Sequence, residues 1–333
     1  MTGGAPVAVT LGDPAGVGPE VTARAWEARM DAALPPFFAV GDAAAVERIW
    51  PGPVERINDI EGVASAFGRA LPVWQVEDSG PPTPGAPSAQ SSLCALHALE
   101  CGIGFVRQQA ASALVTGPVS KRALHAIGYT HPGQTEFIAE RCGVPADKAV
   151  MMLAGPGLRV VPLTVHMPLC DVPAALTADL ILTKARATAR GLSRDFGITA
   201  PRLAIAGLNP HAGEGGQLGG EEIATIEPAV AILRGEGIDI TGPLAADAMF
   251  APHIRSQYDT LLCAYHDQAL GPFKALHFHD GVNLTLGLPI VRTSPDHGTA
   301  FGIAGTGTAD PGPTIAAIRL ACAMAAERRA ADA

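Results

Sequence analysis

The feature that most constrains this chain is the alternation of short apolar runs with longer amphipathic stretches. The apolar runs end close to Gly, Pro or Asp, and each has the length of a single strand. Strands that alternate with helices build βαβ units around a largely parallel sheet, so the sequence predicts an α/β fold. Candidate strands are PVAVTL, FFAV, LPVWQV, ALVT, AVMMLA, LRVVPLTV, RLAIAGL, TLLCAY and VNLTLG, and candidate helices cover residues 19–30, 43–50, 89–111, 135–142, 178–191, 221–234 and 313–329.

Composition narrows the class of protein. A chain of 333 residues, 48% hydrophobic and only 17% charged, can bury a large core and is unlike a disordered protein. The net charge of -9 disfavours nucleic acid and anionic lipid as partners. The sequence shows no signal-peptide pattern and no apolar stretch of the roughly 20 residues that a membrane span needs. The six cysteines form no CxxC pair. We therefore expect a cytoplasmic enzyme or binding protein that acts on a small molecule.

Three histidines follow three of the candidate strands. His166 closes LRVVPLTVH, His211 follows the strand of RLAIAGLNPH, and His266 closes TLLCAYH. The ligand sites of α/β sheets lie at the ends of strands. Three imidazoles gathered there around one divalent cation would leave coordination positions open for a substrate, as in a catalytic metal site. The alternative is that each histidine is an unrelated, hydrogen-bonded residue of the core or of a loop.

Acidic residues near these histidines are candidates for supporting roles. Asp267 is adjacent to His266, and Asp247 lies in PLAADAMF. Either carboxylate could hold a ligand imidazole by its second nitrogen, and either could instead be an ordinary helix cap or surface acid. Glu214 lies in HAGEGG, where a mobile glycine-rich backbone disfavours a fixed ligand.

Two glycine-rich segments are candidates for binding an anion or a nucleotide. TLGDPAGVGPE places Gly12, Gly16 and Gly18 between a strand and a helix, where free backbone N–H groups could face an anion. Its GxxxGxG spacing is not a dinucleotide fingerprint, and a tight turn is the alternative reading. The second segment, DHGTAFGIAGTGTADPGP, also lacks that fingerprint but suggests a nucleotide. Its most distinctive residues are His297, Gly298, Thr299 and Ala300.

Five polar residues could bind an anionic substrate. Lys274, Asn283 and Arg292 flank a candidate strand and could clamp a carboxylate or phosphate by charge-assisted hydrogen bonds. Gln134 and Thr135 open the helix QTEFIAERC, where exposed N–H groups favour a phosphate. The alternatives are solvated charges for the first group and helix capping by Thr135 for the second.

The order of the motifs resembles that of one known family. In this order along the chain, motifs of the 4-hydroxythreonine-4-phosphate dehydrogenase (PdxA) family are resembled by GDPAGVGPE, VTGPVSK, GQTEF, VPLTVH, GLNPHAGEGG, AYHDQ and HGTAFGIAGTG. The resemblance extends from Leu11 to Gly312, and motifs such as GLNPHAGEGG and AYHDQ are long and unusual.

This resemblance implies an isocitrate/isopropylmalate-dehydrogenase-like fold of two domains with a cleft between them. Residues 1–128 and 285–333 would form the nucleotide side, and residues 129–284 the metal, substrate and dimerisation domain. The family also implies a homodimer with a shared active site.

The resemblance assigns roles to the candidate residues. His166, His211 and His266 would bind one divalent metal, Zn, Mg or Co, with His266 supplied by the neighbouring subunit. Thr135, Lys274, Asn283 and Arg292 would contact the substrate, and HGTAFGIAGTG, with His297 to Ala300, would contact NAD or NADP.

Two positions depart from the family pattern. Gln134 stands where the family usually has His in GHTE, and a neutral amide cannot carry positive charge. Gly302 stands where many relatives carry Asp in the nucleotide loop. The first departure puts the identity of the substrate in doubt, and the second puts the details of cofactor contact in doubt.

The implied reaction is the oxidation of 4-phosphooxy-L-threonine at C3 by NAD. The metal would bind the amine and the C3 hydroxyl, and the 3-keto acid formed would lose CO₂ to give 3-amino-2-oxopropyl phosphate. Asp247, Asp267 and a water on the metal are all candidates for the general base. Alternatives are the same chemistry on 4-phosphothreonate, 4-phosphoerythronate or a cyclic dihydrodiol dicarboxylate, a phosphate acyltransferase, and a noncatalytic metal-binding scaffold.

Overall fold

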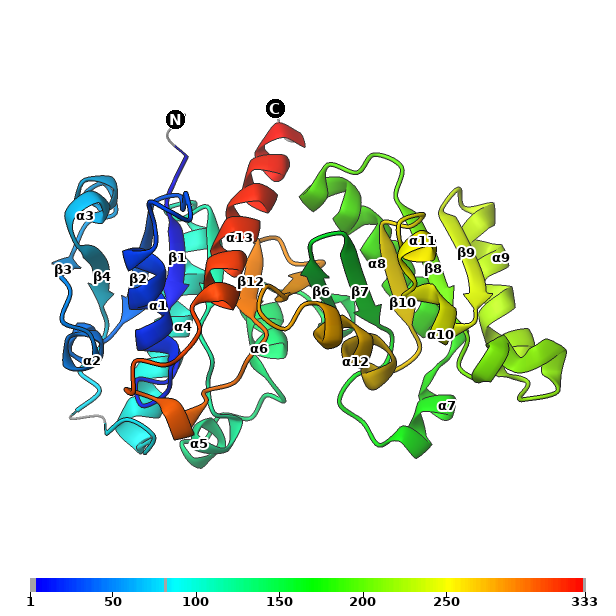
Figure 1. Cartoon of the computed structure of the whole chain (residues 1–333), viewed down its shortest axis with the longest axis horizontal. Coiled ribbons are helices and arrows are strands. Elements are labelled where there is room, and N and C mark those ends of the chain that lie inside the picture. Colours follow the sequence, from blue (N-terminus) through cyan, green and yellow to red (C-terminus); the bar gives the residue numbers. More distant parts are fainter. Residues whose placement is uncertain (1–3, 81–82, 332–333) are drawn as a thin grey trace. The chain divides into compact units, whose positions relative to one another are not determined.

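The chain folds into two compact α/β units (Figure 1). The computed structural model describes residues 4–80 and 83–331. The first unit combines the chain up to Gly143 with Leu288–Ala326, and the second combines Val144–Gly287 with the segment that begins at Glu327. The structure divides after residue 143, whereas the sequence analysis placed a boundary after residue 128. The intervening segment contains Gln134 and Thr135, which therefore belong to the first unit.

The first unit contains a parallel sheet whose inner strands are fully buried. Its strand order is β3-β4-β2-β1-β5-β12, and every described pair is parallel. Burial on both faces explains why β1, β2 and β5 are continuous apolar runs rather than alternating ones. The strands are β1 (Val7–Thr10), β2 (Phe37–Gly41), β3 (Val54–Ile57), β4 (Leu71–Gln75), β5 (Ala113–Thr116) and β12 (Arg292–Pro295).

Helices cover this sheet. The longest that lies wholly within the first unit, α4, packs against β1, β2 and β5 and begins with a capping box between Ser88 and Ser91. The helices are α1 (Gly18–Glu27), α2 (Ala43–Ile49), α3 (Val63–Arg69), α4 (Ala89–Arg107), α5 (Lys121–Ala126), α6 (Gln134–Arg141) and α13 (Gly312–Ala331), whose last residues belong to the second unit.

The second unit contains a mixed sheet. Its strand order is β11-β6-β7-β10-β8-β9, and β6 runs antiparallel to both of its neighbours. The connection of Pro156 and Gly157 between β6 and β7 is a tight hairpin, so the prediction of a parallel sheet fails locally here. The strands are β6 (Val150–Gly155), β7 (Leu158–Pro162), β8 (Arg202–Ala206), β9 (Asp239–Leu244), β10 (Thr260–Cys263) and β11 (Val282–Leu286).

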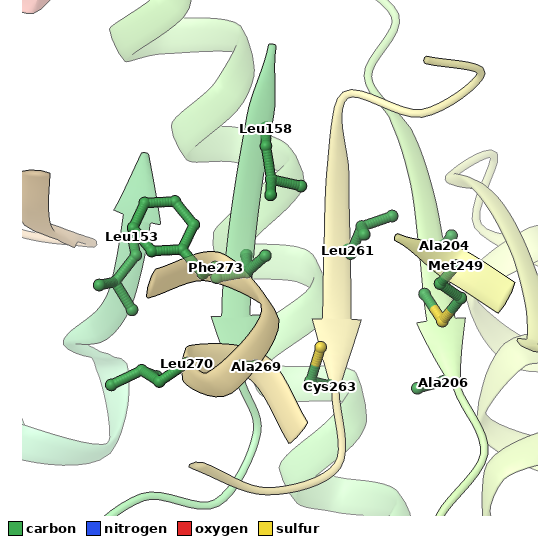
Figure 2. Close-up of a cluster of buried hydrophobic side chains, with 11 residues drawn as sticks. Leu153, Leu158, Ala204, Ala206, Met249, Leu261, Cys263, Ala269, Leu270 and Phe273 are labelled. Carbon is green, nitrogen blue, oxygen red and sulfur yellow. The ribbon is translucent and has the colours of Figure 1, made fainter. Parts of the chain in front are cut away.

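The core of the second unit joins this sheet to α12. Leu153 and Leu261 of the strands pack with Leu270 and Phe273 of that helix, which lies over the strands in Figure 2. Helix α8 packs against β6 and β11, and α9 against β9. The helices are α7 (Val172–Ala175), α8 (Ala178–Phe196), α9 (Glu227–Gly235), α10 (Ala246–Met249), α11 (Pro252–Arg255) and α12 (His266–Leu276). Shorter turns of 3-10 helix cover Ala146–Lys148, Leu169–Asp171 and Phe301–Ile303, and a π-helix covers Glu222–Ile226. The segment Pro210–Gly216 is a turn with left-handed backbone.

The predicted α/β class is confirmed, and each candidate strand is present. Three strands that are short or carry polar residues, β3, β9 and β12, were not predicted, and neither were the helices α3, α5, α7, α10, α11 and α12. Gly271 and Pro272 interrupt the helical pattern of α12, which explains why its first residue, His266, was taken for the end of a strand. Among the described residues, no helix is long and apolar enough to cross a membrane.

Candidate functional site

The two glycine-rich segments form one structure in the first unit. The turn from β1 into α1 contains Gly16 and Val17, and it lies against Thr299 of the second segment. The Val17 N–H donates to the Thr299 carbonyl over 3.0 Å, and a Cβ on Gly16 would lie 3.0 Å from the same oxygen. The first segment is therefore a tight turn, as the alternative reading predicted, and it also supports the predicted nucleotide loop.

One face of α1 holds the loop that follows. Glu20 is 3% exposed, and its carboxylate accepts the N–H of Gly305 over 3.1 Å and the N–H of Ala309 over 2.9 Å. Arg24 donates to the carbonyl of Gly307 over 3.2 Å. Two valines of the same helix face, Val17 and Val21, form an apolar cluster with Ala304 and Ala309. The sequence analysis missed Glu20 and Arg24, although the i, i+3, i+4, i+7 spacing of these four residues marks one helix face.

The predicted cofactor residues stand at the start of this loop. Nδ1 of His297 donates to the carbonyl of Gly298 over 3.0 Å, while its Nε2 is buried and has no hydrogen-bond partner. Ala300 has a φ of 42°, in the left-handed region that side chains other than glycine rarely adopt. Backbone in this conformation collects at ligand sites, so the geometry favours a binding role for the segment.

Gln134 and Thr135 lie in the first turn of α6. Gly133 is the N-cap, and no side chain caps the helix, so the alternative reading of Thr135 as the cap is wrong. Nε2 of Gln134 donates to the carbonyl of Gly117 over 3.1 Å, which leaves Oε1 buried without a partner. Lys121, which the sequence analysis missed, places Nζ 3.6 Å from where a Cβ on Gly133 would lie. Oε2 of Glu136 lies 3.1 Å from the same point. The uncapped helix N-terminus and the ammonium group favour an anion here, whereas this carboxylate opposes one.

Arg292 is buried in β12. It is 4% exposed, and its guanidinium donates from Nη2 to Oγ1 of Thr116 over 2.8 Å. Burial lowers the pKa of Arg292 to about 10, so the side chain remains charged at neutral pH. The alternative reading of Arg292 as a solvated charge is therefore wrong. The carboxylate of Glu136 acts in the opposite direction to burial and favours the charged guanidinium.

In the second unit, His166 and His266 lie side by side. The strands that lead to them, β7 and β10, are parallel neighbours in the sheet. Their ring centroids are 5.7 Å apart, and both residues line a cavity of about 400 Å³ together with Tyr265 and Asp267. One chain already brings the His266 ring next to that of His166. That the partner subunit supplies His266 to a metal site stays a prediction.

Asp267 contacts the ring of His266 directly. Its Oδ1 lies 2.6 Å from Nδ1 of His266, and the carboxylate is otherwise 87% exposed. A carboxylate that accepts a hydrogen bond from one ring nitrogen leaves the other nitrogen free to bind a metal, which is the usual arrangement around ligand histidines.

His211 lies apart, on a turn with unusual backbone. Its side chain is 71% exposed, and its Nδ1 is 3.7 Å from Glu214. Asp247 is exposed on α10, which lies against the same turn. Within residues 4–80 and 83–331, no group of three or more His, Cys, Asp or Glu residues is placed to hold a metal ion. One chain therefore assembles two of the three predicted histidines.

Lys274 and Asn283 also belong to the second unit. Lys274 is half-buried on α12, and Asn283 is half-buried in β11, opposite Leu153 of β6. Oδ1 of Asn283 is buried and lacks a partner, as do Oε1 of Gln134 and Nε2 of His297. Buried polar atoms are almost always hydrogen-bonded, and a ligand could supply the missing bond at these three positions. Partnerless buried atoms also occur outside the predicted site, in Arg29, Arg255, His277 and Thr314.

Comparison with known proteins identifies relatives over nearly the whole chain. The model of the family described as "Pyridoxal phosphate biosynthetic protein PdxA" matches residues 34–321. A 4-hydroxythreonine-4-phosphate dehydrogenase of Zymomonas mobilis is 54% identical over 325 residues, which cover 98% of this chain and 97% of the relative.

Solved structures agree with this match. A 4-hydroxythreonine-4-phosphate dehydrogenase from Klebsiella pneumoniae aligns with a TM-score of 0.86 and 35% identity, covering 96% of this chain and 99% of that one. A terephthalate 1,2-cis-dihydrodiol dehydrogenase from Burkholderia xenovorans aligns with a TM-score of 0.65 and 30% identity, covering 96% and 98%. These alignments confirm the predicted fold class.

Proposed function

Because the chain belongs to the PdxA family, we propose that it is a 4-hydroxythreonine-4-phosphate dehydrogenase that uses NAD or NADP. It oxidises 4-phosphooxy-L-threonine to 2-amino-3-oxo-4-phosphooxybutanoate, which loses CO₂ to give 3-amino-2-oxopropyl phosphate on the way to pyridoxal phosphate. The observation that carries this proposal is the 54% identity to a dehydrogenase of that name across 98% of the chain. The predicted family motifs lie within that alignment.

The first unit is the proposed cofactor side. A nicotinamide cofactor accepts the hydride that leaves C3 of the substrate. His297, Gly298, Thr299 and Ala300 would contact it, supported by the partnerless Nε2 of His297 and the left-handed backbone at Ala300. The close packing of this segment on the turn before α1 supports a binding surface that is formed before the cofactor arrives.

The second unit is the proposed metal side, and the residues present fit a divalent cation. His166 and His266 offer two neighbouring imidazoles, Asp267 orients one of them, and His211 would be the third ligand. When bound, Zn, Mg or Co would lower the pKa of the substrate hydroxyl. The contact of Asp267 with His266 supports an orienting role for this acid. Asp247, on the helix against the His211 turn, and a water on the metal are then the other candidates for the general base.

The substrate would be held by charge and by hydrogen bonds. Arg292, charged and buried, and Lys274 on α12 would bind its anionic groups, and Asn283 would use its partnerless Oδ1 to accept a hydrogen bond. Thr135 and Gln134 would bind at the uncapped start of α6. These groups recognise a small phosphorylated acid rather than a neutral alcohol.

We propose a homodimer in which two chains complete each metal site, because one chain brings only His166 and His266 together. Co-expression of His211→Ala and His266→Ala chains tests this. If the ligands come from different subunits, one site of each mixed dimer keeps all three histidines, and activity returns to on the order of a quarter of wild type in a random mixture. If one chain supplies all three, the mixture stays inactive.

The activity itself is tested by following NADH formation with three substrates. Initial rates are compared for 4-phosphooxy-L-threonine, 4-phosphoerythronate and an aromatic cis-diol, with and without a chelator. The proposal requires the first substrate to be the best and the rate to disappear on chelation. A preference for another diol would instead indicate that this protein performs the same chemistry on that diol, an alternative that the neutral Gln134 supports. Absence of substrate-dependent absorbance would leave phosphate acyl transfer as the rival.

A further inference from the structure

The turn that carries His211 is unfavourable on its own. From His211 to Gly215 the φ angles are 53°, 53°, 78°, 45° and 65°, so five successive residues adopt the left-handed region. Three of them, His211, Ala212 and Glu214, carry side chains. Such residues visit this region singly and not in succession, because Cβ approaches the backbone carbonyl too closely. Contacts elsewhere in the second unit must therefore hold the turn.

Glu222 supplies the contacts that hold it. Its side chain is 1% exposed, and its Oε1 accepts the backbone N–H of Asn209, the residue that begins the turn, over 2.8 Å. Its Oε2 accepts Nδ2 of the same asparagine over 3.0 Å, and that Nδ2 also donates to Oε2 of Glu221 over 2.8 Å. Both carboxylate oxygens thus bind one residue, which fixes the entry into the left-handed segment.

The surrounding glycines make room for this carboxylate. A Cβ on Gly213 would lie 2.6 Å from Oε2 of Glu222, and a Cβ on Gly207 would lie 3.0 Å from Oε1. Glu222 also begins the π-helix that runs to Ile226, and π-helical turns are rare and frequently mark functional sites. The sequence GLNPHAGEGG therefore has glycine where the carboxylate must approach.

We propose that Glu222 is the positioning residue for His211, an inference that rests on His211 being a metal ligand as proposed above. Because the His211 side chain is 71% exposed, its direction is set by the turn rather than by packing around the ring. Glu222 fixes the turn and so fixes the imidazole. Its carboxylate needs no contact with the metal or with the substrate for this role.

The test uses the full-length protein and Co²⁺ as the metal. Glu222→Gln keeps the shape but removes the charge and one acceptor, so Asn209 loses one of its two bonds to residue 222 and keeps its bond to Glu221. We expect Co²⁺ affinity, measured by calorimetry and by the visible spectrum of bound Co²⁺, to fall about 10- to 100-fold, as for other residues that support metal ligands. NAD⁺ affinity should stay within about twofold. Glu227→Gln, an exposed change at the start of α9, is the matched control and should leave both unchanged.

Two further variants separate positioning from general stability. Asn209→Ala removes both Nδ2 bonds, to Glu222 and to Glu221, and keeps the backbone bond to Oε1 of Glu222. It should weaken Co²⁺ binding similarly, which keeps the test open if Glu222→Gln folds poorly. On a His211→Ala background, Glu222→Gln should cause no additional loss, because the two residues act through one ligand.

Three outcomes would overturn the inference. The first is a Co²⁺ affinity within twofold of wild type in both Glu222→Gln and Asn209→Ala. The second is that Glu222→Gln lowers Co²⁺ affinity as much on the His211→Ala background as in the wild type. The third is that Glu222→Gln lowers NAD⁺ affinity as much as it lowers Co²⁺ affinity. If wild-type protein binds no Co²⁺, the metal site proposed above fails first, and the inference falls with it.

Discussion

A buried glutamate holds a glycine-rich segment in each unit, but the two segments differ in strain. In the first unit, Glu20 accepts two N–H groups from the loop that follows Ala300, and the positive φ angles at residues 305 and 307 fall on glycine. In the second unit, Glu222 holds a turn in which His211, Ala212 and Glu214 all have positive φ.

The difference lies in what else supports each segment. The loop in the first unit also packs Ala304 and Ala309 onto Val17 and Val21, so the carboxylate is one of several contacts. The turn in the second unit is mostly exposed, and of its residues only Gly213 is buried. We infer that the Glu20 carboxylate adds to the stability of a loop that apolar packing already holds. The Glu222 carboxylate, in contrast, determines the conformation of its turn.

The largest effect on activity should come from substituting His211, the proposed metal ligand on the strained turn. His211→Ala removes a proposed metal ligand, and we expect kcat to fall by about 1000-fold or more because the hydroxyl is no longer activated. NAD⁺ affinity, whose proposed site lies in the other unit, should stay within about twofold. Steady-state rates and calorimetry measure the two quantities, and His253→Ala, an exposed histidine of α11, is the control. Retained turnover would remove His211 from the site.

A smaller effect on the same side should follow from Asp267→Asn. The amide keeps an oxygen near His266 but loses the charge, so the ring is held less firmly and binds a cation less well. We expect metal affinity to fall about 10- to 100-fold, with kcat recovered at saturating metal. A kcat that stays low when metal saturates would instead make Asp267 the general base.

On the cofactor side, Glu20→Gln should act more weakly. It removes one of two acceptors while the apolar cluster persists, so we expect KM for NAD⁺ to rise about tenfold, with kcat changed less than about threefold. Hydrogen exchange at Gly305 and Ala309 in the free protein should accelerate. Glu27→Gln, exposed on the same helix, is the control. Unchanged exchange at both amides would show that Glu20 does not hold the loop.

The smallest effect should come from Gln134→His. An imidazole with a pKa near its usual value of about 6.5 gains charge as pH falls, so it should strengthen substrate binding below that pH and leave it unchanged above. The substrate phosphate also titrates there, so the ratio of mutant to wild-type KM is the measurement. We expect this ratio to fall about threefold between pH 8 and pH 6. A ratio independent of pH would place Gln134 away from the anionic group.

Periodicity and motif order predict much of this molecule, because apolar runs and strand ends are local properties of the chain. Thus the strands leading to His166 and His266 could be predicted. The supporting residues could not, since Glu20 and Glu222 are ordinary helical glutamates until the fold places backbone N–H groups against them. The left-handed conformation of Ala212 has no local signal either.

The neighbouring strands that present His166 and His266 also bear on the order of events in folding. Oγ1 of Thr164 donates to the carbonyl of Ala264, a residue 100 positions away along the chain, just before the two histidines. Such distant pairing closes a long loop and forms slowly, so a cation cannot template this part of the sheet early. At the proposed site it would bind the folded chain instead, and by mass action it would stabilise a structure already formed.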